Sequence, residues 1–209
     1  IASCLVGSEM CIRDRCQADL LEDAWNGTGQ FQGTEPIRGF GAVAGVYEEA
    51  CQIVVRADSE ISTVEELEGH RVSIGEEESG TKQNALQILA AYGLNEKLVE
   101  EVSLNYTEAA KELENGTIDA FFCTAGVQTA AITNLAQRTG IRFLNVDNAA
   151  AARLKKSYPV YDSCIIAAGT YPGQEEDVST VGVKAVLLAS DSVSAEVVEE
   201  LTALLFEEQ

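Results

Sequence analysis

The spacing of hydrophobic residues changes character part-way along the chain. Val72 and Ile74 alternate with polar neighbours, which predicts a short strand before Gly75. From Thr81 onward the apolar residues recur at the spacing of one helix face, and Gly93 stands where a left-handed C-terminal cap belongs. The pattern therefore predicts a strand, a loop and a helix in succession.

The loop between this strand and helix carries Ser79, Gly80 and Thr81. Unpaired N–H groups and the dipole at a helix N-terminus favour an anion, so these residues are a candidate site for a carboxylate or phosphate. The same residues are also ordinary helix caps that need no ligand, and both interpretations stay open. Asn84, one turn into the helix, is equally a candidate amide donor beside Thr81 and a solvated helix residue. Because Lys82 follows the hydroxyl residues instead of preceding them, the loop is not a nucleotide-binding P-loop.

Strands and helices continue to alternate through the middle of the chain. Strands are predicted over 101–104, 118–122 and 141–146, with helices from 107 and over 127–139 between them. This series predicts an α/β fold with a largely parallel sheet, in which ligands bind at the C-terminal ends of strands. Ser79-Gly80-Thr81 and Thr124-Ala125-Gly126 both follow predicted strands in that position.

The pattern at the two ends of the chain is less regular. Helices are predicted over 18–24 and 148–157, strands over 51–55, 164–168 and 181–189, and an amphipathic helix after Ser194. A polar loop surrounds Tyr171. The loops around Ser79, Thr124 and Tyr171 could converge on one cleft.

Composition narrows the classes of function. The net charge of −20, the pI near 4.2 and the 46% of hydrophobic residues indicate a folded, strongly acidic protein, which argues against nucleic acid and anionic membrane surfaces as partners. No window approaches the roughly 18 apolar residues of a membrane span, so direct membrane insertion is not expected. Six cysteines without a C-x-x-C pair and a single histidine, His70, predict neither a metal site nor a cofactor.

The candidate chemistry is that of binding. G-x-S-x-G, H-E-x-x-H and G-x-G-x-x-G motifs are absent from the sequence, and no nucleophile has a base assigned to it. The loops supply hydroxyls, amides, backbone N–H groups and aromatic rings instead. The sequence therefore predicts a binding protein without catalytic residues rather than an enzyme.

Four segments together resemble one known family. They are Gln52-Ile53-Val54-Val55-Arg56-Ala57-Asp58-Ser59, Ser79-Gly80-Thr81-x-x-Asn84-Ala85, Asp119-Ala120-Phe121-Phe122-x-Thr124-Ala125-Gly126 and Ala168-Gly169-Thr170-Tyr171-Pro172-Gly173-Gln174. In this order they are similar to the TAXI family, the extracytoplasmic solute-binding proteins of tripartite ATP-independent periplasmic (TRAP) transporters. The resemblance covers about 17–209.

The resemblance implies a type II periplasmic-binding-protein-like α/β fold, in which two α/β lobes close on a ligand cleft. Residues 17–59 with 166–209 would form lobe one and 60–165 lobe two, with the chain truncated at both ends. Residues 1–16 do not share the pattern of the rest and resemble a translated adapter tract, so they are expected to be a non-native leader. The resemblance also implies a periplasmic or extracytoplasmic location, with the signal peptide missing from this sequence.

The implied function is capture of a small carboxylate, such as glutamate or a related amino acid or dicarboxylate, and its delivery to the TRAP transporter membrane subunits. The residues at matching motif positions would bind this ligand. They are Ser79, Gly80, Thr81 and Asn84 in one segment and Thr124, Ala125, Gly126 and Thr129 in the next, with Tyr47 and Tyr171 as aromatic walls.

One departure from the family pattern leaves the ligand's charge open. Family loops resemble G-x-x-G-S-G-T, whereas Glu76, Glu77 and Glu78 precede Ser79 here. Three carboxylates would weaken an anion site unless they face solvent or pair with bases. Two alternative functions also stay open, namely a sensing module of the same fold coupled to a signalling partner, and an enzyme acting on a small anionic metabolite through these glutamates.

Overall fold

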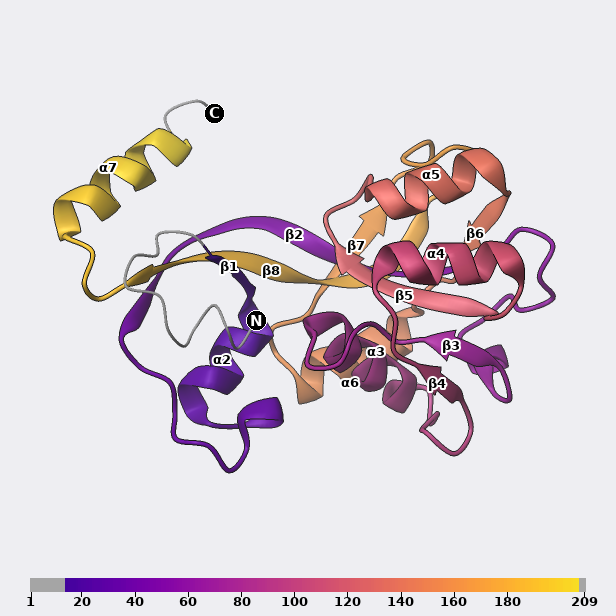
Figure 1. The fold of residues 1–209 in the computed structure, drawn as a ribbon, viewed down its shortest axis with the longest axis horizontal. Coiled ribbons are helices and arrows are strands. Elements are labelled where there is room, and N and C mark those ends of the chain that lie inside the picture. Colours follow the sequence, from indigo (N-terminus) through magenta and orange to yellow (C-terminus); the bar gives the residue numbers. More distant parts are fainter. Residues whose placement is uncertain (1–13, 207–209) are drawn as a thin grey trace. The chain divides into compact units, whose positions relative to one another are not determined.

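A computed structural model describes residues 14–206 of the chain. These residues divide into two compact units, 14–47 with 184–206, and Glu48–Val183. Strands β2 (Phe40–Arg56) and β8 (Val178–Ser190) each contribute residues to both units (Figure 1). The lobe boundaries expected from the sequence stay a prediction.

The larger unit contains the predicted series of strands and helices. Strand β3 (Arg71–Ser73) pairs in parallel with both β4 (Glu100–Val102) and β5 (Ala120–Ala125). Because an α-helix connects each strand to the next, this part of the sheet has the parallel order that such crossovers produce. The C-terminal ends of β3 and β5 therefore meet at one edge of the sheet.

The expectation of a largely parallel sheet is wrong for the pairings of β2 and of β7 (Asp162–Ile166) with β8. Strand β2 is antiparallel to β5 and also to β6 (Ile141–Phe143), so it lies between two strands that run in one direction. Strand β7 is antiparallel to β8. Strands β2 and β5 are not consecutive in the chain. The alternation of strands and helices in the sequence therefore could not predict that β2 pairs with β5.

Four helices accompany these strands, and all four were predicted. They are α3 (Gly80–Ala91), α4 (Tyr106–Asn115), α5 (Ala130–Arg138) and α6 (Asn148–Ser157); a short 3-10 turn, η2, covers Glu65–Leu67. Helix α6 begins after Asp147, whose carboxylate accepts hydrogen bonds from the N–H groups of Ala149 and Ala150. Helix α4 ends at Gly116 in the left-handed conformation, which glycine adopts without steric cost.

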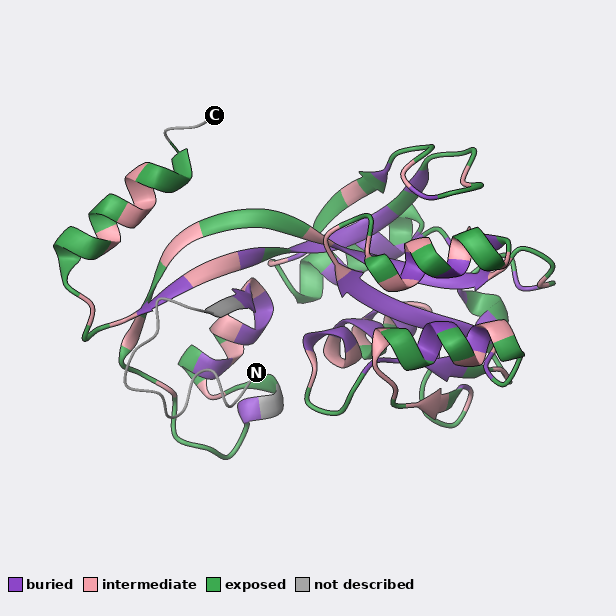
Figure 2. Cartoon of the chain, turned by 45° about the horizontal axis from the view of Figure 1, so that its top comes forward, coloured by how far each residue is buried: buried purple, intermediate pink, exposed green. Residues whose placement is uncertain are grey.

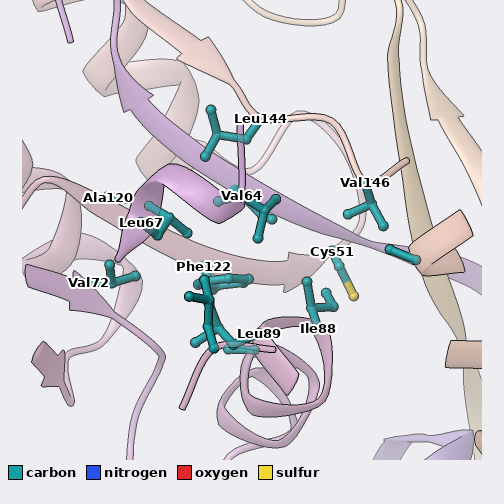
Figure 3. Close-up of a cluster of buried hydrophobic side chains, with 14 of the residues drawn as sticks. Cys51, Val64, Leu67, Val72, Ile88, Leu89, Ala120, Phe122, Leu144 and Val146 are labelled. Carbon is teal, nitrogen blue, oxygen red and sulfur yellow. The ribbon is translucent and has the colours of Figure 1, made fainter. Parts of the chain in front are cut away.

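The sheet of this unit is buried on both faces. Along β5, Ala120 and Phe122 enter one hydrophobic cluster, while Phe121 and Cys123 enter another, as expected for alternating side chains. Helices α3 and α6 cover the first cluster, and α4 and α5 the second. Figure 3 shows part of the first cluster, with Phe122 close to Leu89 of α3. The result is three layers, helix–sheet–helix, which fix the edge where the loops follow β3 and β5.

The smaller unit contains β1 (Asp14–Gln17), α2 (Ala18–Asn26), the 3-10 turn η1 (Gly29–Phe31) and α7 (Ala195–Phe206). Strand β1 pairs antiparallel with β8, and its first three residues belong to the expected leader. The rest of that leader, 1–13, lies outside the described residues. Helix α7 confirms the predicted C-terminal helix, and it has no buried residue (Figure 2).

Candidate ligand-binding site

The loop between β3 and α3 is held by backbone geometry that requires glycine. Gly75 has φ +99°, and a Cβ at this position would lie 2.9 Å from the Thr81 side chain. Ser79 caps α3, because its Oγ accepts a hydrogen bond from the Lys82 N–H at 3.1 Å. The helix-cap interpretation of Ser79 is therefore confirmed. The N–H groups of Gly80 and Thr81, in the first turn, have no carbonyl four residues earlier within the helix.

A chain of hydroxyl groups connects this loop to the end of β5. The Thr81 Oγ1 lies 2.5 Å from the Tyr106 hydroxyl, which donates to the Thr124 carbonyl at 2.9 Å. The Thr124 N–H in turn donates to Thr81 Oγ1 at 3.4 Å. Burial raises the pKa of Tyr106, so its phenol stays protonated and remains a donor. The structure thus brings the start of α3 and the end of β5 together, as the positions of Ser79–Thr81 and Thr124–Gly126 predicted. Thr124 and Ala125 belong to β5 itself, which ends later than expected.

Tyr106 was not among the residues proposed from the sequence, which placed the start of its helix at Thr107. The helix begins one residue earlier because Asn105 caps it. Asn105 Oδ1 accepts from the Glu108 N–H, and the Glu108 carboxylate accepts from the Asn105 N–H. An Asn followed three residues later by Glu is a capping-box pattern, and this signal was present in the sequence.

A pocket of about 440 Å³ lies where the N-termini of α3 and α4 meet. Its lining residues are Glu76, Ser79, Thr81, Leu104, Asn105, Tyr106 and Thr107. Two of the predicted ligand residues, Ser79 and Thr81, are in this set. The volume is within the range of small-molecule sites, and two helix N-termini favour a ligand that carries negative charge.

A second network orders the loop after β5. Thr129 donates from its hydroxyl to the Gly126 carbonyl at 2.9 Å and from its N–H to the Tyr171 hydroxyl at 3.1 Å. The Tyr171 hydroxyl donates to Oε1 of Gln52 at 2.5 Å, and Gln52 Nε2 lies 3.5 Å from the Ala125 carbonyl. Gln52 was not predicted, although a buried amide in a strand needs a polar partner.

Tyr171 is part of the core of the larger unit. It is 2% exposed, its ring packs against Phe143 with centroids 5.2 Å apart, and burial raises the pKa of its hydroxyl. In this position its hydroxyl supports the Thr129 loop. Its role as an aromatic wall of the ligand site stays a prediction.

Two further candidates lie away from the pocket lining. Asn84 is fully buried, so the solvated alternative is wrong, and its Nδ2 donates to the Tyr161 hydroxyl at 2.7 Å. Tyr161 donates onward to Gln87 Oε1 at 2.6 Å. Tyr47 belongs to the smaller unit and is 37% exposed. Ligand contacts by either residue stay a prediction.

The three consecutive glutamates have different surroundings. Glu77 forms an ion pair with Lys82 at 2.6 Å and accepts a hydrogen bond from the Ser103 hydroxyl, and these two bonds lower the pKa of its carboxyl. Glu76 and Glu78 are both exposed, and Glu78 has φ +58°. Glu76 lines the pocket. Glu77 therefore pairs with a base. Glu76 is the glutamate of the three that lines the pocket, so its charge is the one that bears on the charge of the ligand.

The surroundings of Glu77 bear on whether it could act as a general acid. Glu77, held as a carboxylate by Lys82 and Ser103, is poorly suited to donate a proton near neutral pH. Within 14–206, no three His, Cys, Asp or Glu side chains are grouped so that they could hold a metal ion. In the same part of the chain, no helix combines the length and the apolar character needed to cross a membrane.

The family model described as the NMT1-like family matches residues 14–209. The chain belongs to the NMT1-like family. Among solved structures, the NMT1-like chain is similar to an ABC transporter periplasmic binding protein from Brucella ovis with glutathione bound, at 9% identity and a TM-score of 0.50. The match covers 87% of this chain and 49% of that protein. The α/β fold of periplasmic binding proteins, expected from the sequence, is thereby confirmed.

Two other solved structures are more distant in shape. The aliphatic sulphonate binding protein SsuA from Escherichia coli is 25% identical over 46% of this chain and 29% of its own length, with a TM-score of 0.40. A substrate binding domain of a putative amino acid ABC transporter from Streptococcus pneumoniae is 12% identical over 80% of this chain and 58% of its own, with a TM-score of 0.45. The NMT1-like chain thus spans between about a third and three-fifths of the length of these two proteins.

Proposed function

We propose that the NMT1-like chain captures a small carboxylate outside the cytoplasm as the solute-binding part of a transporter. The observation that carries this proposal is the pocket where the N-termini of α3 and α4 meet, with Ser79, Asn105 and Thr107 in its lining. The fold of periplasmic binding proteins supports the same function. Glutamate and related amino acids or dicarboxylates are the ligand class.

The donors available to a carboxylate can be named from the hydrogen bonds of the pocket. Thr81 and Tyr106 use their hydroxyls to hold the loops together, whereas the backbone N–H groups of Gly80 and Thr81 point out of the first turn of α3. The amide of Asn105 and the exposed hydroxyl of Thr107 add side-chain donors on the α4 side. Hydrogen bonds to a charged group are each worth about 1.5–3 kcal/mol, enough for capture without covalent chemistry.

Lobe closure would complete the site in this proposal. A ligand that contacts both lobes binds the closed state more tightly than the open state, and it shifts the population by that difference in affinity. The closed state would be the one that a membrane partner recognises. Turnover of the bound solute would contradict capture without chemistry.

The membrane partner in this proposal is a TRAP transporter. The four TAXI-like segments support this assignment, whereas the proteins from Brucella ovis and Streptococcus pneumoniae named above are described as ABC transporter proteins. Uptake measured with the membrane subunits of each class distinguishes the two. Delivery to TRAP subunits predicts uptake that persists when ATP is depleted, and uptake that stops on ATP depletion assigns the chain to an ABC transporter.

Ligand capture is tested by thermal unfolding of the chain with L-glutamate, glutarate, succinate and L-alanine. A ligand at a hundred times its dissociation constant adds about 2.7 kcal/mol of stability. Thr107→Val removes a pocket hydroxyl and should weaken binding several-fold. Thr63→Val makes the same change at an exposed position outside the pocket lining and should leave binding unchanged. No shift with any carboxylate would refute the proposed function.

A further inference from the structure

The described lining of the pocket carries a negative charge. Among residues 14–206, Glu76 is the one acidic residue in its lining, and no Lys or Arg from this range belongs to the lining. The two basic residues nearest in sequence, Arg71 and Lys82, pair with Glu100 and Glu77. Among the described residues, the Glu76 side chain forms none of the ion pairs. The pocket therefore offers hydrogen-bond donors for one anionic group and a carboxylate that can accept from a cation.

The position of Glu76 is fixed by the helix cap. Its carbonyl accepts hydrogen bonds from the Ser79 N–H at 3.2 Å and from the Ser79 hydroxyl at 2.7 Å. The same hydroxyl caps α3. The Glu76 backbone is thus tied to the residue that begins the candidate anion site, and both residues belong to the lining of the same pocket.

We propose that Glu76 determines specificity by accepting a hydrogen bond from the ammonium group of the ligand, so that the pocket selects zwitterionic amino acids over dicarboxylates and other carboxylates without an amine. This inference rests on the proposed function and narrows its ligand class. The ligand's carboxylate binds the donors at the N-termini of α3 and α4, and its ammonium group pairs with Glu76.

Electrostatics favours this division of roles. A dicarboxylate would bring its second negative charge into a pocket that already holds a carboxylate, within a chain of net charge −20. An amino acid brings an ammonium group together with its α-carboxylate, and this positive charge offsets the repulsion between Glu76 and the ligand's carboxylate. The glutamate that weakens a simple anion site thereby becomes a source of affinity and selectivity.

The experiment uses pairs of ligands that differ by one amino group. L-Glutamate is compared with glutarate, and L-alanine with propionate, by titration calorimetry on the chain. Each amino acid is expected to bind at least tenfold more tightly than its partner without the amine. Glu76→Gln should weaken binding of the amino acids at least tenfold and abolish the difference within each pair. Glu78→Gln, an exposed change in the same loop but outside the pocket lining, should preserve both affinity and preference.

The outcomes separate this inference from the function on which it rests. Binding of glutarate or propionate as tightly as the matching amino acid overturns the role of Glu76 and leaves carboxylate capture standing. A preference for amino acids that survives in Glu76→Gln also overturns it. Absence of binding by all four ligands overturns both proposals. If the Glu76→Gln protein does not fold, equal binding within the ligand pairs on the unaltered chain still overturns the role of Glu76.

Discussion

The hydroxyl oxygens of Thr81 and Tyr106 lie 2.5 Å apart and connect the first turns of α3 and α4. Because the Tyr106 hydroxyl also donates to the Thr124 carbonyl, this single phenol group holds three segments in place. Two of those segments line the pocket. The geometry of the candidate site therefore depends on a residue whose own hydroxyl is occupied within the protein.

Tyr106→Phe is expected to lower both stability and affinity. The change removes the hydroxyl and leaves the Thr124 carbonyl and the Thr81 hydroxyl without that partner, which costs about 1–3 kcal/mol. Chemical denaturation measures the loss of stability, and calorimetry measures the loss of affinity. Tyr158→Phe, at a ring that is 41% exposed, is the matched control and should change neither. Equal effects of the two substitutions would contradict the conclusion that the Tyr106 hydroxyl holds the Thr81 and Thr124 segments in place.

Gly75→Ala tests the close packing of the loop against α3. The new methyl group would lie 2.9 Å from Thr81 at a φ of +99°, so it adds a steric clash to the strain of the left-handed region. Gly93→Ala is a matched control, because Gly93 also has a positive φ, +78°, but has open space around it. We expect Gly75→Ala to destabilise the protein by at least about 1 kcal/mol more than Gly93→Ala. Identical unfolding midpoints would show that the loop relaxes away from Thr81.

Leu89→Ala tests the core that supports the pocket. Leu89 is 1% exposed and packs in the cluster that α3 shares with β5, and truncation of such a residue costs about 2–5 kcal/mol. Leu86 lies on the same helix but is 37% exposed, so Leu86→Ala should cost less than about 1 kcal/mol. Urea denaturation of both variants provides the comparison. A small loss for Leu89→Ala would mean that α3 is not anchored through this cluster.

The sequence predicted the elements that depend on local patterns. The bounds of α6 agree residue for residue with the prediction, because Asp147 provides a cap and apolar residues recur at helical spacing after it. The edge where the Ser79 and Thr124 loops meet also followed from the alternation of strands and helices. Both inferences use contacts between residues close in sequence or in consecutive elements.

Features that depend on distant pairs were missed. The buried hydrogen bond between Gln52 and Tyr171 joins residues 119 positions apart, and no local sequence pattern predicts such a contact. The antiparallel insertion of β2 beside β5 is a pairing of the same kind. Tyr106 was missed for a different reason, since its capping box was readable but its hydroxyl partners lie in other elements. Local periodicity defines elements, whereas their lateral order and polar contacts are set by the whole chain.

The cap of α6 gives a prediction about pH. Hydrogen bonds from the Ala150 N–H and then from Tyr92 hold the pKa of Asp147 below its ordinary value of 3.8. A carboxyl whose pKa is lower in the folded state stabilises that state above the unfolded pKa, and this contribution disappears as the pH falls through the folded pKa. Asp147→Ala should therefore cost about 0.5–2 kcal/mol at pH 7, and the cost should shrink as the pH falls below 3.8.

Asp147→Asn separates charge from hydrogen bonding at this cap. Asparagine also caps helices well, so this variant should keep most of the stability at pH 7 but lack the titration of the aspartate. Unfolding free energies of the three proteins, measured by urea denaturation between pH 3 and pH 7, provide the test. The curves for the unaltered protein and Asp147→Asn should converge at the acid end. Parallel curves across the whole range would show that ionisation of Asp147 does not contribute to the stability of α6.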